Sequence, residues 1–262
     1  MQSDPRAWIA ALRSSHDRLA GLAGPLSAEQ VRGPSYCRDW TIAQVLSHLG
    51  SGAEIGLLML PGALGEGEPV TPEAFGPVWD AWNAKTPDAQ AADALAADDA
   101  HVTALEQLTD AQLGAISMSF FGMELDAVGL VRLRLGEHVL HTWDVAVALD
   151  PAATVPPGAV DLLTDNVAEF LAPRLGKAPA APFAVRITTT APDRDYLLAT
   201  ADAVQMTPWP EGSTGTLARP VAMPSEALLR LAYGRLDPEH TPAGVSGDAT
   251  DLARLREIFP GF

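Results

Sequence analysis

The chain has 262 residues, of which 47 % are hydrophobic and 19 % are charged, so it can bury a core and is not a disordered chain. Its formal net charge is −16. Such an acidic chain repels phosphate backbones and anionic lipid headgroups, so we exclude nucleic acids and membrane surfaces as partners. With a lone cysteine, no apolar run long enough to span a membrane and no signal-peptide pattern, the chain is expected to be cytoplasmic.

The first half of the chain is predicted to be helical, because apolar residues recur there at helical spacing between Gly and Pro interruptions. Helices are predicted over residues 8–22, 41–60, 75–85, 87–108 and 127–149. The second of these is expected to stop before Pro61, because proline cannot donate a backbone hydrogen bond inside a helix.

The composition changes after residue 152, which divides the chain into domains 1–152 and 153–262. In the second domain, β-branched and aromatic residues alternate over short runs that are typical of strands. Strands are predicted over residues 183–190, 196–200 and 203–206. Helices are predicted over residues 160–171, 225–232 and 249–258, and the first of them is expected to end before Pro173. The fold class is therefore α+β.

The segment from Gly136 to Asp144 contains the most informative pair of polar residues. Glu137 and His141 are four residues apart, so on a helix they lie on one face with Cβ atoms about 6 Å apart. Imidazole nitrogen and carboxylate oxygen both bind zinc. By itself this spacing is weak evidence, since many helices carry Glu and His by chance, and a hydrogen-bonded pair at the surface or at a helix cap explains it better.

A second histidine makes a shared metal ion the better explanation. His48 lies on or beside the apolar stripe of the helix predicted from residue 41. Two largely apolar helices that each direct histidines inward need a polar partner for them, and facing helices of a bundle often build metal sites in this way. We therefore predict that His48, Glu137 and His141 hold one divalent cation.

Several stretches of sequence resemble a known family. Asp39-Trp40-Thr41-Ile42-Ala43-Gln44-Val45-Leu46-Ser47-His48-Leu49 resembles the first motif of the DinB-like, mycothiol-dependent maleylpyruvate isomerase family. Glu137-x-x-x-His141-x-x-Asp144 resembles its second motif. Leu231-Ala232-Tyr233-Gly234-Arg235-Leu236, with Val245-Ser246-Gly247-Asp248 and Phe259-Pro260-Gly261, more loosely resembles its C-terminal domain.

The resemblance implies a DinB-like four-helix bundle followed by a smaller α+β domain. It also implies that His48, Glu137 and His141 bind a divalent metal, usually zinc, although ligand type does not separate zinc from nickel, manganese or iron. Mycothiol is the implied thiol cofactor or co-substrate. A thiol, whose ordinary pKa is about 8.5, would lose its proton at such a cation and become the nucleophile.

Other polar residues were weighed against structural roles. Asp144 either receives the second N–H of His141 or is an ordinary exposed carboxylate. Arg235, in the second domain, either assists catalysis by clamping a carboxylate or lies on the surface. Arg132 and Arg134 face either solvent or an anionic substrate.

The remaining candidates are expected to be structural. We interpret His138 as structural, Cys37 as packing and Trp40 as a buried residue at the helix start. His16, His101 and His240 are expected to lie on the surface.

The function predicted first is a thiol S-transferase or isomerase that acts on a small electrophilic substrate through a metal-activated thiolate. One alternative is a metal-dependent hydrolase that uses a bound water, for which Asp144 is the nearby base. Another is a protein that binds a small molecule without turnover. The predicted partners are a small-molecule substrate and a low-molecular-weight thiol, in a monomer or homodimer.

Overall fold

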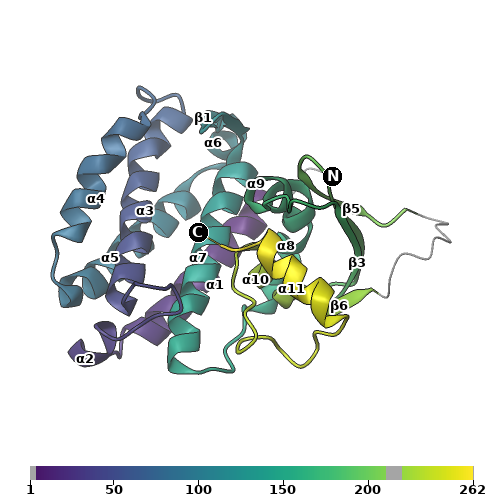
Figure 1. The fold of residues 1–262 in the computed structure, drawn as a ribbon. Helices are drawn as coiled ribbons and strands as arrows, with labels where there is room; N and C mark the ends of the chain where they lie inside the picture. The colour runs from purple at the N-terminus through teal and green to yellow at the C-terminus, as the bar shows by residue number, and fades with distance from the viewer. Residues whose placement is uncertain (1–3, 211–219, 262) are drawn as a thin grey trace. The chain divides into compact units, whose positions relative to one another are not determined.

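The computed structural model describes residues 4–210 and 220–261, and the chain divides into two compact units, Met1–Thr154 and Val155–Phe262 (Figure 1). Unit 1 is mainly helical, and unit 2 combines helices with a sheet. Among the described residues, no helix has the length and apolar character needed to cross a membrane.

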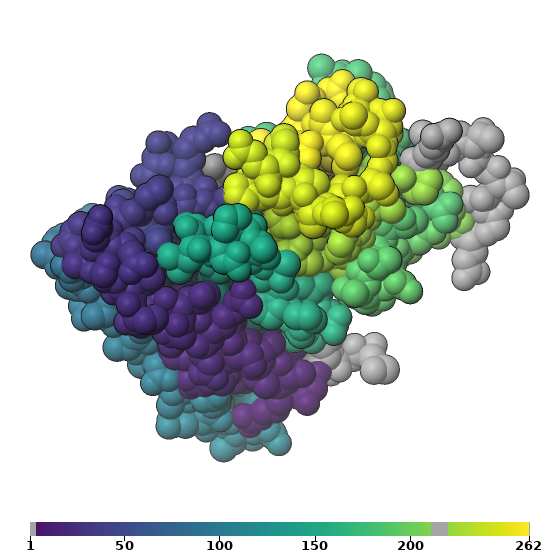
Figure 2. Space-filling model, turned by 90° about the horizontal axis from the view of Figure 1, so that it is seen from below, coloured from purple at the N-terminus to yellow at the C-terminus, as the bar shows by residue number. Residues whose placement is uncertain are grey.

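Four long helices form the bundle of unit 1: α1 (Pro5–Ala23), α3 (Ile42–Ala63), α5 (Pro87–Gln107) and α7 (Ala127–Leu149). α1 packs against α5 and α7, and α3 packs against the same two helices, so all four surround one core. Figure 2 shows α1, in purple, beside the blue residues of α5. The core is built from fully buried leucines such as Leu12, Leu19, Leu46, Leu49, Leu105 and Leu135.

Local signals begin the two helices that carry the candidate ligands. Thr41 and Gln44 form a capping box at the start of α3, in which each side chain accepts a hydrogen bond from the backbone N–H of the other. Asp126 caps α7 by accepting from the N–H of Gly129 at 2.8 Å. The prediction that the second helix stops before Pro61 is wrong: α3 continues to Ala63, because a proline in the last turn removes only one donor.

The shorter elements of unit 1 are α2 (Ala28–Val31), η1 (Pro72–Ala74), α4 (Phe75–Asn83), α6 (Asp110–Ala115), β1 (Met118–Phe120) and β2 (Met123–Leu125). The hairpin of β1 and β2 was not predicted, since three-residue strands are too short to show alternation. Its two-residue turn, Phe121-Gly122, has positive φ at both positions, as a tight hairpin turn requires.

Unit 2 contains a sheet with strand order β5-β4-β3-β6, in which β3 and β6 are parallel and the other neighbours antiparallel. The strands are β3 (Phe183–Thr190), β4 (Arg194–Thr200), β5 (Val204–Pro208) and β6 (Val221–Pro224). Val185 and Ile187 of β3 pair with Leu198 and Tyr196 of β4, and all four side chains are buried. The sheet therefore shows the alternation that the sequence predicted, and β6 is an addition to it.

The helices of unit 2 are α8 (Pro157–Asn166), η2 (Val167–Leu171), α9 (Ala172–Leu175), α10 (Ser225–Ala232) and α11 (Ala249–Ile258). The predicted stop before Pro173 is wrong. The helix passes through a π-helical turn, η2, and Pro173 then stands in the first turn of α9, where a missing N–H is tolerated.

Candidate metal centre

Three side chains from two helices of the bundle converge in unit 1. His48 comes from α3, and Glu137 and His141 come from adjacent turns of α7. One potential ligand atom from each lies within 4.8 Å of the other two. His48 Nε2 is 3.5 Å from Glu137 Oε2, and His141 Nε2 is 3.6 Å from the same oxygen. The predicted set is thus brought together in space.

These separations suit a single cation. Zinc lies about 2.0–2.2 Å from imidazole nitrogen and carboxylate oxygen, so tetrahedral geometry requires ligand atoms about 3.4 Å apart. The side chains of His48 and Glu137 are 40 % and 44 % exposed, which leaves room for a small-molecule donor beside them. The donor set therefore fits a divalent metal that keeps a position for an exogenous ligand.

Asp144 sets the orientation of one imidazole. Its carboxylate is fully buried and accepts a hydrogen bond from His141 Nδ1 at 2.8 Å. With the proton held on Nδ1, the lone pair of Nε2 points toward Glu137 and His48. Asp144 is therefore the imidazole partner that the sequence suggested, rather than an exposed carboxylate.

Cys37 lies behind the same imidazole. Its thiol donates to Asp144 Oδ2 at 3.0 Å and is 3.7 Å from His141 Nδ1. Cys37, His141 and Asp144 form a second group close enough to hold an ion. Because the two groups use opposite nitrogens of His141, and Nδ1 already donates to Asp144, the group of His48, Glu137 and His141 is the better cation site.

Trp40 is beside the metal centre and not in the core. Its ring centroid is 5.5 Å from that of His48 and 6.3 Å from that of His141, and its plane is 20° from the latter ring. It is 38 % exposed, so the expectation of a buried residue is wrong. Its place before the helix capping box puts it over the imidazoles instead, where it forms an aromatic wall.

The electrostatics of the site favour positive charge at His141, which lies between the carboxylates of Glu137 and Asp144. Burial opposes ionisation of Glu137, but the imidazoles of His141 and His48 outweigh it and hold the pKa of that carboxyl well below its usual range. Burial also disfavours a charged His141, yet the hydrogen bond to Asp144 leads the contacts that raise its pKa to about 10. A proton or a metal cation at His141 is stabilised by the same neighbours.

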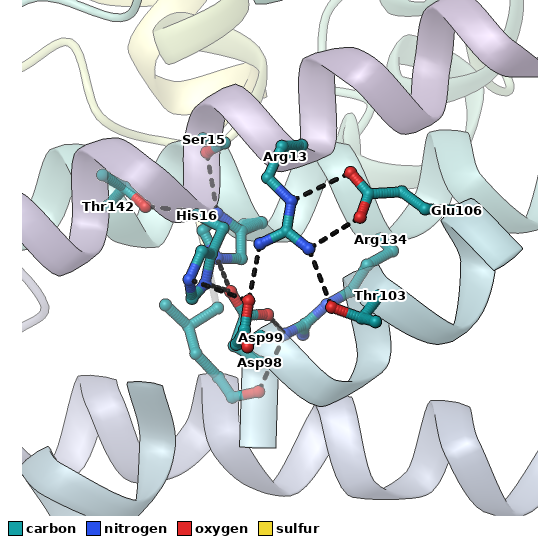
Figure 3. Close-up of polar contacts among 11 residues, drawn as sticks. Arg13, Ser15, His16, Asp98, Asp99, Thr103, Glu106, Arg134 and Thr142 are labelled. Carbon is teal, nitrogen blue, oxygen red and sulfur yellow. Dashed lines mark hydrogen bonds and ion pairs between the residues drawn. The ribbon is translucent and has the colours of Figure 1, made fainter. Parts of the chain in front are cut away.

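A buried polar network lies on the other side of α7. His138 is fully buried, as its structural role predicted, and its Nε2 is 2.7 Å from Asp98 Oδ2. Asp98 of α5, also fully buried, receives His16 Nδ1 at 2.8 Å and Arg134 Nη2 at 2.7 Å as well (Figure 3). Ser15 contacts the second nitrogen of His138 at 2.7 Å. The network ties α1, α5 and α7 together next to the metal-bearing turn.

Several predictions of exposure were wrong for this region. His16 and His101 are 7 % and 5 % exposed, although both were expected on the surface. The guanidinium of Arg134 pairs with Asp98 and donates to Leu49 O at 2.9 Å, so its charge is compensated within the bundle and is not exposed to solvent. The helical spacing of Ala94, Asp98, His101 and Leu105 was the missed signal, because it places both polar residues on the buried stripe of α5.

Arg235 lies in unit 2 and is 7 % exposed, not a plain surface residue. It follows Gly234, whose φ of 74° belongs to the left-handed region, after the end of α10. Its Nη1 donates to Tyr233 O at 2.9 Å. A catalytic role for Arg235 stays a prediction. His240, half-buried in the same unit, contacts Asp237 through Nδ1 at 2.9 Å.

The fold and the site define a two-unit protein whose helical bundle carries a His/Glu/His candidate metal centre. Two family models match the chain. The mycothiol maleylpyruvate isomerase N-terminal domain matches residues 12–146, and the C-terminal domain of the same enzyme family matches residues 158–254. The chain therefore belongs to the mycothiol-dependent maleylpyruvate isomerase family. No curated protein matches it.

Solved structures confirm the fold class. The crystal structure of the mycothiol-dependent maleylpyruvate isomerase is similar to this chain with a TM-score of 0.64 at 15 % identity, over 93 % of this chain and 92 % of that one. A histidine-to-alanine mutant of that isomerase gives the same values. The predicted DinB-like four-helix bundle followed by a smaller α+β domain is thus confirmed.

Proposed function

We propose that this protein is a metal-dependent enzyme that uses mycothiol as cofactor or co-substrate, and acts as a thiol S-transferase or isomerase on a small electrophilic organic substrate. The observation that carries the proposal is the convergence of His48, Glu137 and His141, with ligand atoms within 4.8 Å of one another. Family membership supports the choice of mycothiol and of isomerase or transferase chemistry. Zinc is the proposed metal, and a cytoplasmic monomer or homodimer is the proposed form.

Each residue has a separate part in this proposal. His48, Glu137 and His141 would hold the cation, which when bound lowers the pKa of a thiol so that the thiolate is present at neutral pH. Asp144 keeps the Nδ1 proton of His141 in place, which orients the ring. Trp40 covers one side of the imidazoles. In an isomerase the thiol adds to a double bond, the adduct rotates and the thiol leaves; in a transferase the adduct is the product.

The position of Asp144 argues against the hydrolase alternative. Asp144 was the base that the sequence offered for activating water, but its carboxylate is fully buried and receives His141 and Cys37. A base must reach the proton that it removes, directly or through one water. The buried carboxylate is better suited to positioning His141, so we favour thiol chemistry.

Metal content and turnover test the proposal together. Purified protein is expected to contain about one divalent ion per chain, and His48→Ala and His141→Ala to lose it on dialysis, whereas His240→Ala, the matched histidine control in unit 2, keeps it. Turnover of an electrophile should require both metal and added mycothiol. Elemental analysis and a thiol titration measure these. A His48→Ala protein with full metal and full activity would refute the site.

We also propose, on the ground of the family resemblance, that Arg235 contributes to the reaction. Arg235→Lys keeps the charge but loses the planar, bidentate donor. The expected result is a normal metal content with reduced turnover, which separates a catalytic contribution from metal binding. Unchanged turnover in this variant would remove Arg235 from the mechanism and leave the metal centre standing.

A further inference from the structure

A cavity of about 220 Å³ opens beside the candidate metal centre within unit 1. His48 and Glu137 form part of its wall, so a molecule in the cavity lies next to two of the proposed ligands. The rest of the wall is almost entirely apolar and comes from α3, α4, α5, α7 and the β1–β2 hairpin. Representative wall residues are Met59, Phe75, Leu105, Phe120, Leu130 and Val131.

Apart from the proposed ligands, Arg134 and His101 are the ionisable side chains of this wall. Arg134 is paired with the buried carboxylate of Asp98 at 2.7 Å, so its charge is already compensated. Burial lowers the pKa of His101 to about 3, so its imidazole is uncharged at neutral pH. His101 Nδ1 has no hydrogen-bond partner among the described residues. Away from the candidate metal centre, the wall thus offers a carboxylate no uncompensated cation.

The rim of the cavity carries aromatic side chains that folding does not bury. Phe121, at the turn of the β1–β2 hairpin, is 70 % exposed and has a positive φ of 47°. Trp79 of α4 is 46 % exposed, and its ring packs edge-on against Phe75 at 6.0 Å. Large exposed apolar side chains at a cavity mouth are typical of a ligand-binding site.

From these features we propose that the cavity selects electrophiles with an uncharged, ring-sized apolar body, and excludes those whose body carries a carboxylate. This inference rests on the proposed function for its chemistry, because the metal centre would act on the atom of the substrate nearest His48 and Glu137. An apolar protein cavity of about 150 Å³ is enough for a benzene ring, so about 220 Å³ admits a substituted ring. An unpaired carboxylate would lose its hydration without a compensating partner.

Binding can be measured without metal, thiol or turnover. 1,3-Dinitrobenzene and 3,5-dinitrobenzoate have the same ring and nitro groups and differ by one carboxylate. Calorimetric titration of the unmodified protein should show dinitrobenzene binding at least about tenfold more tightly, which corresponds to about 1.4 kcal/mol. Equal or tighter binding of the benzoate would overturn the inference.

A charge introduced into the wall provides the matched test. Leu130→Arg places a cation among the apolar wall residues and should weaken dinitrobenzene and strengthen dinitrobenzoate, so that the ratio of their dissociation constants shifts at least about tenfold. Leu58→Arg is the control, because Leu58 lies on α3, is 44 % exposed and is not part of the wall. A shift of the same size in the control variant would contradict the assignment of the cavity.

Turnover then separates this inference from the proposed function. With mycothiol and metal-loaded protein, 1-chloro-2,4-dinitrobenzene and 4-chloro-3,5-dinitrobenzoate undergo the same substitution: the thiolate sulfur bonds to the ring carbon, chloride leaves, and the thiol proton passes to solvent. Rates are taken relative to the uncatalysed reactions, and the uncharged compound should be favoured at least about tenfold in kcat/KM. Preference for the benzoate overturns the inference while the function stands. No catalysis of either compound, with selective dinitrobenzene binding intact, supports the cavity and refutes the S-transferase form of the proposed function.

Discussion

The buried carboxylate of Asp98 provides the sharpest test of how the bundle is held together. Asp98 is fully buried and lies 2.7 Å from Arg134 Nη2, 2.7 Å from His138 Nε2 and 2.8 Å from His16 Nδ1 (Figure 3). The pKa of this carboxyl is held well below its usual range, because these partners outweigh the cost of burial. Asp98→Asn keeps the shape of the side chain and removes its charge.

The expected loss can be estimated from the buried ion pair. Removing one partner of such a pair costs about 3–5 kcal/mol, because the other charge is left buried without compensation. At about 2–4 °C per kcal/mol for a chain of this size, the unfolding midpoint of Asp98→Asn should fall by roughly 6–20 °C. Urea denaturation followed by circular dichroism measures the free energy, and a thermal scan measures the midpoint.

The neighbouring residue is a matched control. Asp99 pairs with Arg13 at 2.6 Å, but its side chain is 56 % exposed, so Asp99→Asn should cost less than about 1 kcal/mol. If Asp98→Asn fails to fold, Asp98→Asn combined with Arg134→Met removes both charges and should restore folding. Equal losses for Asp98→Asn and Asp99→Asn would refute the reasoning, since burial is the property that distinguishes them.

Two further predictions concern the same bundle. The hydrogen bond with Asp98 raises the pKa of His16 from 6.5. The stabilisation by protonated His16 is therefore complete below about pH 6.5 and is lost as the pH rises through the pKa that His16 has in the folded protein. In urea denaturation, His16→Gln should lower the free energy of unfolding more at pH 5.5 than at pH 9, and equal losses at the two pH values would contradict this. Gly50→Ala brings a methyl carbon against the ring of Trp82 and to 2.9 Å from the backbone of Ala94, so overpacking should destabilise the protein by about 1–3 kcal/mol. At Gly21 an added methyl carbon meets no atom within 4 Å, so Gly21→Ala should instead stabilise α1 by up to about 1 kcal/mol. A thermal scan in which both variants shift the unfolding midpoint in the same direction would contradict this.

The candidate metal ligands could be predicted from sequence because their spacing is local. Glu137 and His141 share a face of any helix that contains both, and the helix over residues 127–149 was predicted with the bounds that α7 has. His48 needed one long-range step, which the apolar stripe of its helix and the family resemblance supplied. The convergence itself, with 3.5 Å between His48 and Glu137, required the packing of α3 on α7.

Tertiary structure alone decided the surroundings of that site. Asp98 and His101 stand in an Ala- and Asp-rich helix whose composition indicates a solvated face, but both are buried: Asp98 contacts His16 of α1 and His138 of α7, and His101 lies against Gly56 of α3. Trp40 is at a helix start, where packing against the first turn was expected, and the approach of α3 to α7 places it over the imidazoles instead. The β1–β2 hairpin is too short to show alternation, and only its position in the fold makes it part of the cavity wall.

Helical periodicity and donor chemistry are properties of neighbouring residues, so the sequence by itself determined the long helices, the alternation of two strands and the choice of the three candidate donors. Burial, ion pairing and cavity shape depend on which helices meet, and that arrangement is set by the sum of many side-chain contacts that no short segment contains. For this reason the ion pair of Arg134 with Asp98, the burial of His101 and the apolar character of the cavity became visible only in the folded chain.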